Sequence, residues 1–288
     1  AGGLPADATL EADADRETVV GSLKVLSSIE QGHRLRDDAK ALGFPANEQL
    51  IMMDKQPVSI GQSISLIVVG PMKDELLALQ KKNDEWLKTQ KKKKIPAAAA
   101  LAAYVDQSIP NLSSIVMLAT AGDKRMLLTG DARGDRILAG LEQTGVLQPH
   151  GKIHVDVLKI PHHGSANNLD NDFFERITAD HYVFSGDGDY GNPEREAMEM
   201  LFKARGTAPF QIHLTYPVSE IDAARQADWK QQQAKEKQAG KKPRANWNAA
   251  KQDLAAFFGK TKLAEGQKIR IVEENQPHVI DMLEPLGF

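Results

Sequence analysis

The sequence contains no cysteine, and this absence excludes two kinds of structure. Disulfide bonds cannot form, and thiolates cannot hold a metal ion. Any metal site must therefore use the nitrogen and oxygen ligands of histidine, aspartate and glutamate. The absence of cysteine fits a reducing or an oxidising compartment equally well, so it does not decide where the protein works.

Long hydrophobic runs are also missing. The longest uncharged stretch, 95–105, is rich in alanine and is shorter than the roughly 20 apolar residues of a membrane-spanning helix. The start, Ala1-Gly2-Gly3, lacks an initiator methionine and the basic and then apolar profile of a signal peptide. We expect a soluble protein, with the cytoplasm favoured and no membrane partner, and we expect further residues before Ala1 in the intact protein.

No strong net charge dominates the molecule. Lysine and arginine number 36 and aspartate and glutamate 39, which gives a formal net charge of −3, so affinity for nucleic acid would need a local basic patch. One candidate is Lys235–Arg244, flanked by Trp229 and Trp247. It could follow a phosphate backbone while a tryptophan stacks on a base. The alternative is a solvated helical excursion whose tryptophans anchor it to the core.

Alternating strand and helix signals predict a layered α/β sheet. The sequence Gly122-Asp123 between two apolar runs indicates a hairpin. Predicted strands are 49–53, 63–69, 114–119, 125–128, 155–160, 181–185, 211–215 and 268–272. Predicted helices are 16–42, ending at Gly43, 74–90, 134–145, 171–177 and 195–205. The lysine run 91–94 is interpreted as a solvated helix end or a mobile tether.

Two of these apolar runs end in groups that bind metal. Leu128-Thr129-Gly130-Asp131 delivers a carboxylate, and Lys159-Ile160-Pro161-His162-His163-Gly164-Ser165 delivers two imidazoles. Because α/β sheets assemble sites at the carboxyl ends of their strands, we expect the two segments to meet. The alternative for Asp131 is an N-cap of the next helix. The alternative for the histidines is a structural pair at a strand-to-loop corner.

Adjacent histidines are unlikely partners on one ion. In an extended segment the side chains of His162 and His163 would diverge. We therefore expect one histidine to be a metal ligand and the other to face the substrate or a residue that hydrogen-bonds to the metal ligands. The remaining histidines, at positions 150, 154, 181, 213 and 278, are interpreted as satisfied core or edge residues.

The segments NLSSIVMLATAGDKRMLLTGDARGDRIL, LKIPHHGSANN and FSGDGDYGNPEREAMEML together resemble the second half of metallo-β-lactamase-fold hydrolases. The likeness covers about residues 49–216 and is closest to the hydrolase domain of bacterial DNA-uptake channel proteins. It implies a layered αββα sandwich, of which this chain holds the carboxyl-terminal part with helical insertions. It also implies that Asp131 bridges two metal ions, that His163 ligates one of them and that His162 lies near the substrate.

The chain departs from this family in its first half. The family carries a His-x-His-x-Asp-His signature there, and none of the eight histidines of this chain forms it. The nearest string, 33–38, is interpreted as a solvated helix face. Two explanations stay open: an upstream segment of the same protein supplies the missing ligands, or the domain has lost catalysis.

A glycine-rich loop provides further candidates. Asp187, Asp189 and Tyr190 follow a predicted strand, and relatives carry Tyr-Gly-His-Pro where this chain has Asn192 in place of the histidine. We list Asp187, Asp189, Tyr190 and Asn192 as a possible site loop. The domain organisation that we predict is 1–216 for the metallo-β-lactamase-like part with a helical insertion at about 72–110, 217–267 for a basic helical excursion, and 268–288 for a final strand and tail.

These observations favour a metal-dependent hydrolase that acts on a phosphodiester through a metal-bridged water. Asp131 would orient the water, and His162 would stabilise the oxyanion or protonate the leaving group. Two zinc ions suit N and O ligands, and manganese is the alternative. The competing functions are a degenerate binding or scaffold module of the same fold and a lactone or ester hydrolase.

Overall fold

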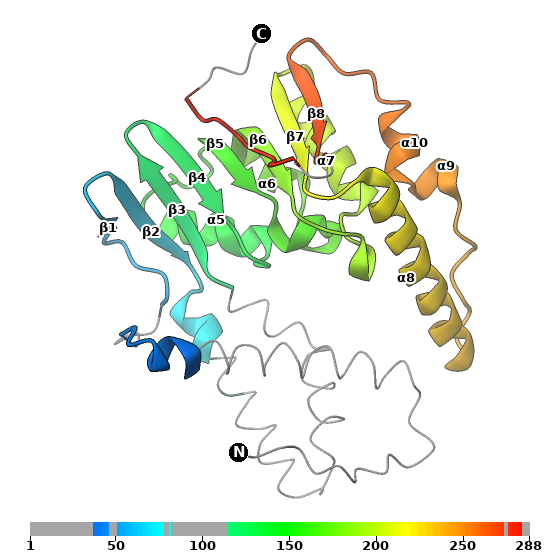
Figure 1. Cartoon of the computed structure of the whole chain (residues 1–288), viewed down its shortest axis with the longest axis horizontal. Helices are drawn as coiled ribbons and strands as arrows, with labels where there is room; N and C mark the ends of the chain where they lie inside the picture. Colours follow the sequence, from blue (N-terminus) through cyan, green and yellow to red (C-terminus); the bar gives the residue numbers. More distant parts are fainter. Residues whose placement is uncertain (1–36, 46–50, 78–80, 82–113, 274–275, 284–288) are drawn as a thin grey trace, which may run out of the picture. The chain divides into compact units, whose positions relative to one another are not determined.

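The computed structural model describes residues 37–45, 51–77, 81, 114–273 and 276–283 (Figure 1). The chain forms two compact units, one of residues 1–50 and 76–110 and the other of residues 51–75 and 111–288. In the first unit, a short helix at 37–41 ends just before Gly43, the predicted stop. Most of the predicted helices 16–42 and 74–90 and the whole of the lysine run 91–94 lie outside the described residues.

The second unit is built on one eight-stranded sheet whose strands lie side by side in chain order (Figure 1). Strands β1 to β4 are antiparallel neighbours, whereas β4 to β8 are parallel. The strands are β1 (Val58–Ile60), β2 (Ile64–Gly70), β3 (Val116–Ala121), β4 (Lys124–Leu128), β5 (Ile153–Lys159), β6 (Ile177–Phe184), β7 (Phe210–Leu214) and β8 (Gln267–Ile271). The prediction of a mixed α/β protein is therefore confirmed.

Helices join the parallel strands and cover one face of the sheet. They are α5 (Gly134–Gln143), α6 (Asn171–Arg176), α7 (Arg195–Arg205), α8 (Val218–Gln238), α9 (Ala249–Gln252) and α10 (Leu254–Phe258). Short 3-10 turns η1 (Pro161–Gly164), η2 (Ala166–Asn168) and η3 (Asp189–Gly191) follow β5 and β6. Among the described helices, none is long and apolar enough to cross a membrane.

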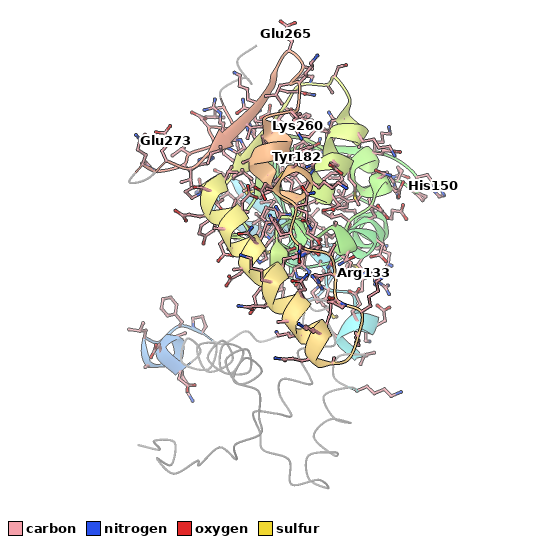
Figure 2. All side chains as sticks on the ribbon, turned by 90° about the vertical axis from the view of Figure 1, so that its right-hand side faces the viewer. Arg133, His150, Tyr182, Lys260, Glu265 and Glu273 are labelled. Atoms are coloured by element: carbon pink, nitrogen blue, oxygen red, sulfur yellow. The ribbon has the colours of Figure 1, made fainter. Side chains whose placement is uncertain are left out.

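The core lies between this helical layer and the sheet. Phe174 of α6 packs edge-on against Tyr182 of β6, with ring centroids 6.4 Å apart, and Tyr182 packs against Phe210 of β7 at 5.6 Å. Tyr182 is fully buried in the interior (Figure 2). Burial raises the pKa of Tyr182 to about 12, and its neutral hydroxyl accepts a hydrogen bond from the backbone N–H of Ala179 at 2.9 Å. The aromatic row thus ties α6 to two parallel strands.

The opposite face of the sheet is apolar and only half-buried along β2 to β4. Side chains alternate along a strand, so the register places on this face the residues Leu66, Val68, Met117, Met126 and Leu128. Each of them is partly exposed. Further along the same face, from β5 to β8, the side chains become polar and include Lys159, His181, His213 and Arg270. The two halves of this face therefore have different chemistry.

Two predicted strands need correction. Residues 51–53, predicted as strand, are irregular. The edge strand at this end of the sheet is β1, which was not predicted because it is only three residues long and exposed. Strand β6 begins at Ile177 and not at His181. Ile177 pairs with Ile153 of β5 and is completely buried, so tertiary pairing ends the preceding helix at Arg176.

The segment after β7 is helical, as its composition predicts. The loop predicted at 235–244 begins only after Gln238, where α8 ends. Trp229 and Trp247 pack edge-on at 5.6 Å, and the indole N–H of Trp229 donates to the carbonyl of Ala245 at 2.8 Å. These contacts hold the returning chain on α8 and favour the anchoring interpretation of the tryptophans over base stacking.

Gly140 allows α5 to approach β2 at van der Waals distance. A methyl group at this position would lie 2.2 Å from the carbonyl oxygen of Val69. We predict that Gly140→Ala lowers the free energy of unfolding by about 2 kcal/mol, because overpacking outweighs the gain in helix propensity. Urea unfolding followed by circular dichroism measures the change. The control is Gly259→Ala, where the nearest atom lies at 3.2 Å and a change within about 0.5 kcal/mol is expected; equal effects of the two substitutions would contradict the packing argument.

Candidate functional site

The two predicted motifs meet at the carboxyl ends of β4 and β5. The strands pair in parallel, with Leu127 opposite Leu158. Beyond this pair, the hydroxyl of Thr129 donates to the carbonyl of Lys159 at 2.7 Å, and the backbone N–H of His162 donates to the carbonyl of Gly130 at 3.1 Å. These bonds continue the strand pairing into the two turns and fix Asp131 beside the histidine pair.

Asp131 does not cap a helix. The N-cap of α5 is Arg133, and no side chain caps that helix, so the N-cap alternative for Asp131 is wrong. The backbone N–H of Asp131 donates to the hydroxyl of Ser114 at 3.2 Å, and its side chain is 36% exposed. The carboxylate is therefore held at the sheet edge, where it remains accessible.

The histidine pair lies in a left-handed turn and not in extended chain. His162 has φ 46° and His163 has φ 55°, both inside η1, and Gly164 follows at φ 90°. The two rings still diverge, with centroids 6.5 Å apart and planes at 73°. A side chain at Gly164 would lie 2.8 Å from Phe184 and 2.9 Å from Pro193, so only glycine fits there. The divergence was predicted correctly, but the backbone that produces it was not.

His163 faces Asp131. Its Nε2 atom lies 3.4 Å from Oδ1 of Asp131, and its Nδ1 atom lies 3.3 Å from the carbonyl oxygen and 3.2 Å from the hydroxyl of Ser185. A carbonyl only accepts, so this contact favours the proton on Nδ1 and leaves the lone pair of Nε2 toward the carboxylate. Two acceptor atoms facing each other need a cation between them, either a proton or a metal ion.

The separation suits a shared metal ion. Zinc binds nitrogen and carboxylate oxygen at about 2.0–2.2 Å, so two ligands of one tetrahedral ion lie about 3.3–3.4 Å apart. Nε2 of His163 and Oδ1 of Asp131 lie at this separation. In the part of the chain that the structure describes, no group of three or more histidine, aspartate or glutamate side chains could hold a metal ion. The described residues therefore provide no complete set of metal ligands.

The ring of His162 diverges from that of His163 and is hydrogen-bonded to Asn168. Burial lowers the pKa of His162, and the neighbouring His163 and Lys159 lower it further, while Asp131 and a hydrogen bond from its ring to Asn168 oppose the shift. The ring is therefore neutral at pH 7. A neutral imidazole has one N–H, so the ring that donates to Asn168 keeps its second nitrogen as an acceptor.

Lys159 was not predicted as a site residue. Its Nζ atom donates to the carbonyl of Gly130 at 2.7 Å and lies 3.9 Å from Oδ1 of Asp131. Burial lowers the pKa of Lys159, and the Asp131 carboxylate opposes that shift. An ammonium group beside Asp131 neutralises part of the carboxylate charge and competes with any metal cation there. The sequence could have identified Lys159, because it is the last residue of β5 and the two motifs already place the site at the carboxyl ends of the strands.

Glu194 and Ser185 were also missed. One carboxylate oxygen of Glu194 accepts from the backbone N–H of Ala166 at 2.6 Å, and its own N–H donates to the carbonyl of Gly164 at 3.0 Å. Glu194 thus clamps the turn that carries His163. Ser185 directly follows β6, so the strand-end rule could have found it, whereas no sequence pattern marks Glu194.

The candidate loop 187–192 lies at the same sheet edge but packs on α8. A side chain at Gly188 would lie 2.4 Å from the carbonyl of Ile221, and Nε of Arg225 donates to the carbonyl of Gly191 at 3.2 Å. Asp187 accepts from the backbone of Asp189 at 2.9 Å, Tyr190 is 72% exposed and Asn192 is buried. These contacts do not bring the loop to Asp131 or His163, so its role in the site stays a prediction.

Comparison with known proteins gives one partial likeness. A stretch of 88 residues, 30% of this chain, is 32% identical to microtubule-associated protein 1A of Rattus norvegicus and of Homo sapiens. The chain spans about 3% of the length of these curated relatives. No protein-family model and no solved structure matches the chain.

The Glu194 clamp generates a pH-dependent prediction. Burial raises the pKa of Glu194 in the folded protein above its ordinary value of 4.5. The contribution of Glu194 to the free energy of unfolding is therefore fully present below pH 4.5, and it is lost as pH rises through the raised pKa. Wild type should therefore lose stability relative to Glu194→Gln as pH rises from 4.5 to 7. Urea midpoints at the two pH values measure the difference. Glu196→Gln, at an exposed position of the same helix, should show no such trend, and a pH-independent difference for Glu194→Gln would contradict the assignment.

Proposed function

We propose that this chain contributes part of a divalent-metal centre to a hydrolase of phosphodiesters. The observation that carries the proposal is the pair Asp131 and His163, with Nε2 and Oδ1 3.4 Å apart and the tautomer of the imidazole set by Ser185. Because the described residues supply two ligands, we propose that the others come from a segment outside the described ranges.

We further propose that the sheet is one layer of a metallo-β-lactamase-type sandwich. The half-exposed apolar face formed by Leu66, Val68, Met117, Met126 and Leu128 supports this proposal. Its opposite face is already covered by α5, α6 and α7. A second apolar sheet packed about 10 Å away would bury these side chains and bring further ligands to the same edge.

The residues of the chain fit distinct tasks. A bound zinc or manganese ion would supply an activated water and charge neutralisation. Asp131 and His163 would hold that ion, and Ser185 and Glu194 keep the His163 ring oriented. The second ring nitrogen of His162 would face the substrate or its attacking water, and Lys159 places a positive charge beside the anionic group of a phosphodiester.

A second candidate is a binding module without catalysis. Its specific support is Lys159, whose ammonium lies 3.9 Å from Asp131 and partly takes the place of a metal cation. In this case the edge would bind an anionic group through Lys159 and the histidines, and no hydrolysis would follow.

Metal binding by this chain tests the site directly. Equilibrium dialysis with Zn²⁺ and Mn²⁺ should show one ion whose affinity falls at least tenfold in Asp131→Asn and in His163→Gln, a loss of about 1.4 kcal/mol or more. His154→Gln is the matched control, since His154 lies on β5 but is exposed and bonded to Thr178. Equal affinity in wild type and both site variants would overturn the metal site.

Hydrolysis by the natural full-length protein separates the two candidates. With bis(p-nitrophenyl) phosphate as substrate, the proposed hydrolase should lose about a hundredfold or more of kcat/KM in Asp131→Asn, an effect of about 3 kcal/mol. If the protein is a binding module, hydrolysis should stay at the background rate in wild type and in the variant, with or without added metal. Metal-dependent cleavage of p-nitrophenyl acetate without cleavage of the diester would instead indicate an esterase.

A further inference from the structure

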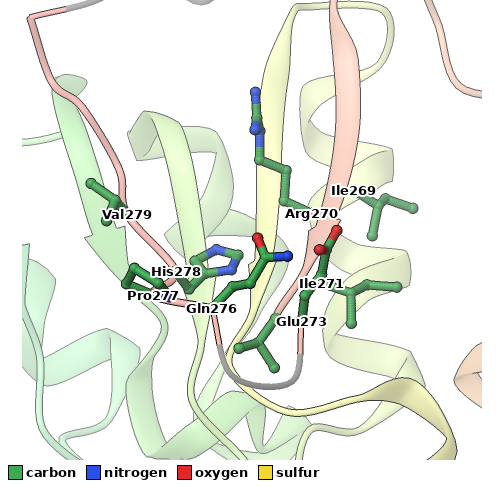
Figure 3. A pocket seen from close by; sticks show the side chains of 9 residues that line it. Ile269, Arg270, Ile271, Glu273, Gln276, Pro277, His278 and Val279 are labelled. Atoms are coloured by element: carbon green, nitrogen blue, oxygen red, sulfur yellow. The ribbon is translucent and has the colours of Figure 1, made fainter.

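Three histidines form a hydrogen-bonded row away from the candidate site. Nδ1 of His181 on β6 lies 3.0 Å from Nε2 of His213 on β7, and Nδ1 of His213 lies 2.8 Å from Nε2 of His278. His278 belongs to the carboxyl-terminal segment 276–283, which runs back beside β7 and β8 (Figure 3). His213 is 1% exposed, and its ring lies 5.1 Å from each of the other two rings.

The row is satisfied when its rings are neutral. A neutral imidazole has one donor and one acceptor nitrogen, so His213 can accept from one neighbour and donate to the other. If His181 and His278 were both charged, each would present a donor to His213, and His213 would need two acceptor nitrogens, which no imidazole has at ordinary pH. The second proton therefore breaks at least one of the two bonds.

The surroundings of the row disfavour positive charge. His213 is faced by His181, by Arg270 on β8 and by His278. Arg270 is held in place because its Nε donates to Oε1 of Gln211 at 2.6 Å. Around His181, Asp180, Asp156 and Lys124 add charges of both signs, with Asp156 and Lys124 already paired at 2.9 Å. A proton added to the middle of the row thus meets a fixed guanidinium, and no carboxylate of the described residues acts on His213 to offset it.

The segment that His278 holds forms one wall of a groove. The groove has a volume of about 620 Å³ and lies between segment 276–279 and β8, with Arg270, Ile271 and Glu273 on the strand side (Figure 3). Detachment of the segment would open this groove and expose His213 to water. It would also expose the polar half of the sheet face that the segment borders.

We propose that this histidine row is an acid-sensitive latch that holds segment 276–283 against β7 near neutral pH and releases it below about pH 6. This inference goes beyond the proposed function and does not depend on it. The latch works because His213 stays neutral in its buried place beside Arg270 while the segment is docked, whereas detachment leaves His213 hydrated and free to take up a proton.

The direction and size of the pH effect follow from linkage. Burial and the neighbouring His181, His278 and Arg270 lower the pKa of His213 to about 3, from an ordinary value of 6.5. Detachment therefore takes up a proton between these two values, and docking is lost as pH falls below 6.5. For one proton, the ratio of detached to docked segment should rise about thirtyfold from pH 7.5 to pH 5.0.

A spin label on the segment measures this ratio. The chain has no cysteine, and Val279 is 71% exposed, so Val279→Cys provides a single labelling site with little disturbance. When pH is lowered from 7.5 to 5.0, the mobile component of the electron paramagnetic resonance spectrum should grow, and the ratio of mobile to immobile label should rise about thirtyfold. An unchanged spectrum over this range would overturn the latch.

Two variants separate the latch from general acid loosening. His213→Phe keeps a ring of similar shape but cannot titrate, so the label should be mobile to the same degree at both pH values. His150→Asn, an exposed histidine outside the row, should keep the full pH response of wild type. Persistence of the pH response in His213→Phe would also overturn the proposal.

Nuclear magnetic resonance of the ring ¹⁵N atoms in the unsubstituted chain provides a test that does not require the His213→Phe variant to fold. At pH 7.5, His213 should show one protonated and one bare nitrogen. A charged His213 at this pH would overturn the proposal.

Discussion

The parallel pairing of β4 with β5 is the constraint on which the candidate site depends. Asp131 and His163 are far apart in the sequence, with α5 and β5 between them. Only the pairing of the two strands brings their side chains together. The pairing continues past the strand ends through Thr129, Gly130 and Lys159, whose hydrogen bonds join one turn to the other. The positions of the two side chains therefore follow from backbone geometry, and the surrounding residues refine only their orientation.

The sequence was most informative where chemistry follows strand order. Asp131 and the histidines each end an apolar run, and the rule that parallel strands end at one edge brought them together correctly. Residues that act through the backbone carry no such signal: Glu194 reaches Ala166 by a fold-dependent contact across 28 positions. The short strand β1 was missed because its alternation, Val58-Ser59-Ile60, covers only three exposed residues and is too short to indicate a strand. The loop at 187–192 was assigned to the site by its place in the chain, but α8 determines where it packs.

The face of the sheet opposite the helices combines two environments. Toward β2 it presents partly exposed apolar side chains, and toward β8 it presents buried histidines linked to the carboxyl-terminal segment. Burying apolar groups is favourable in any geometry, whereas buried imidazoles require a specific set of hydrogen-bond partners. The polar half of the face is therefore tied to one particular covering segment, while the apolar half would accept any apolar layer of suitable shape.

The left-handed turn that carries the histidine pair has a further consequence. Non-glycine residues in this conformation cost of order 1 kcal/mol each or more, and glycine or asparagine would form the same turn at lower cost. Only Gly164 among the three residues is required by sterics. Folding stability by itself would favour replacing both imidazoles. Two histidines at φ 46° and 55° therefore lower the stability of this turn, and the backbone conformation gives no reason for them. The reason must lie in the contacts of the imidazole rings.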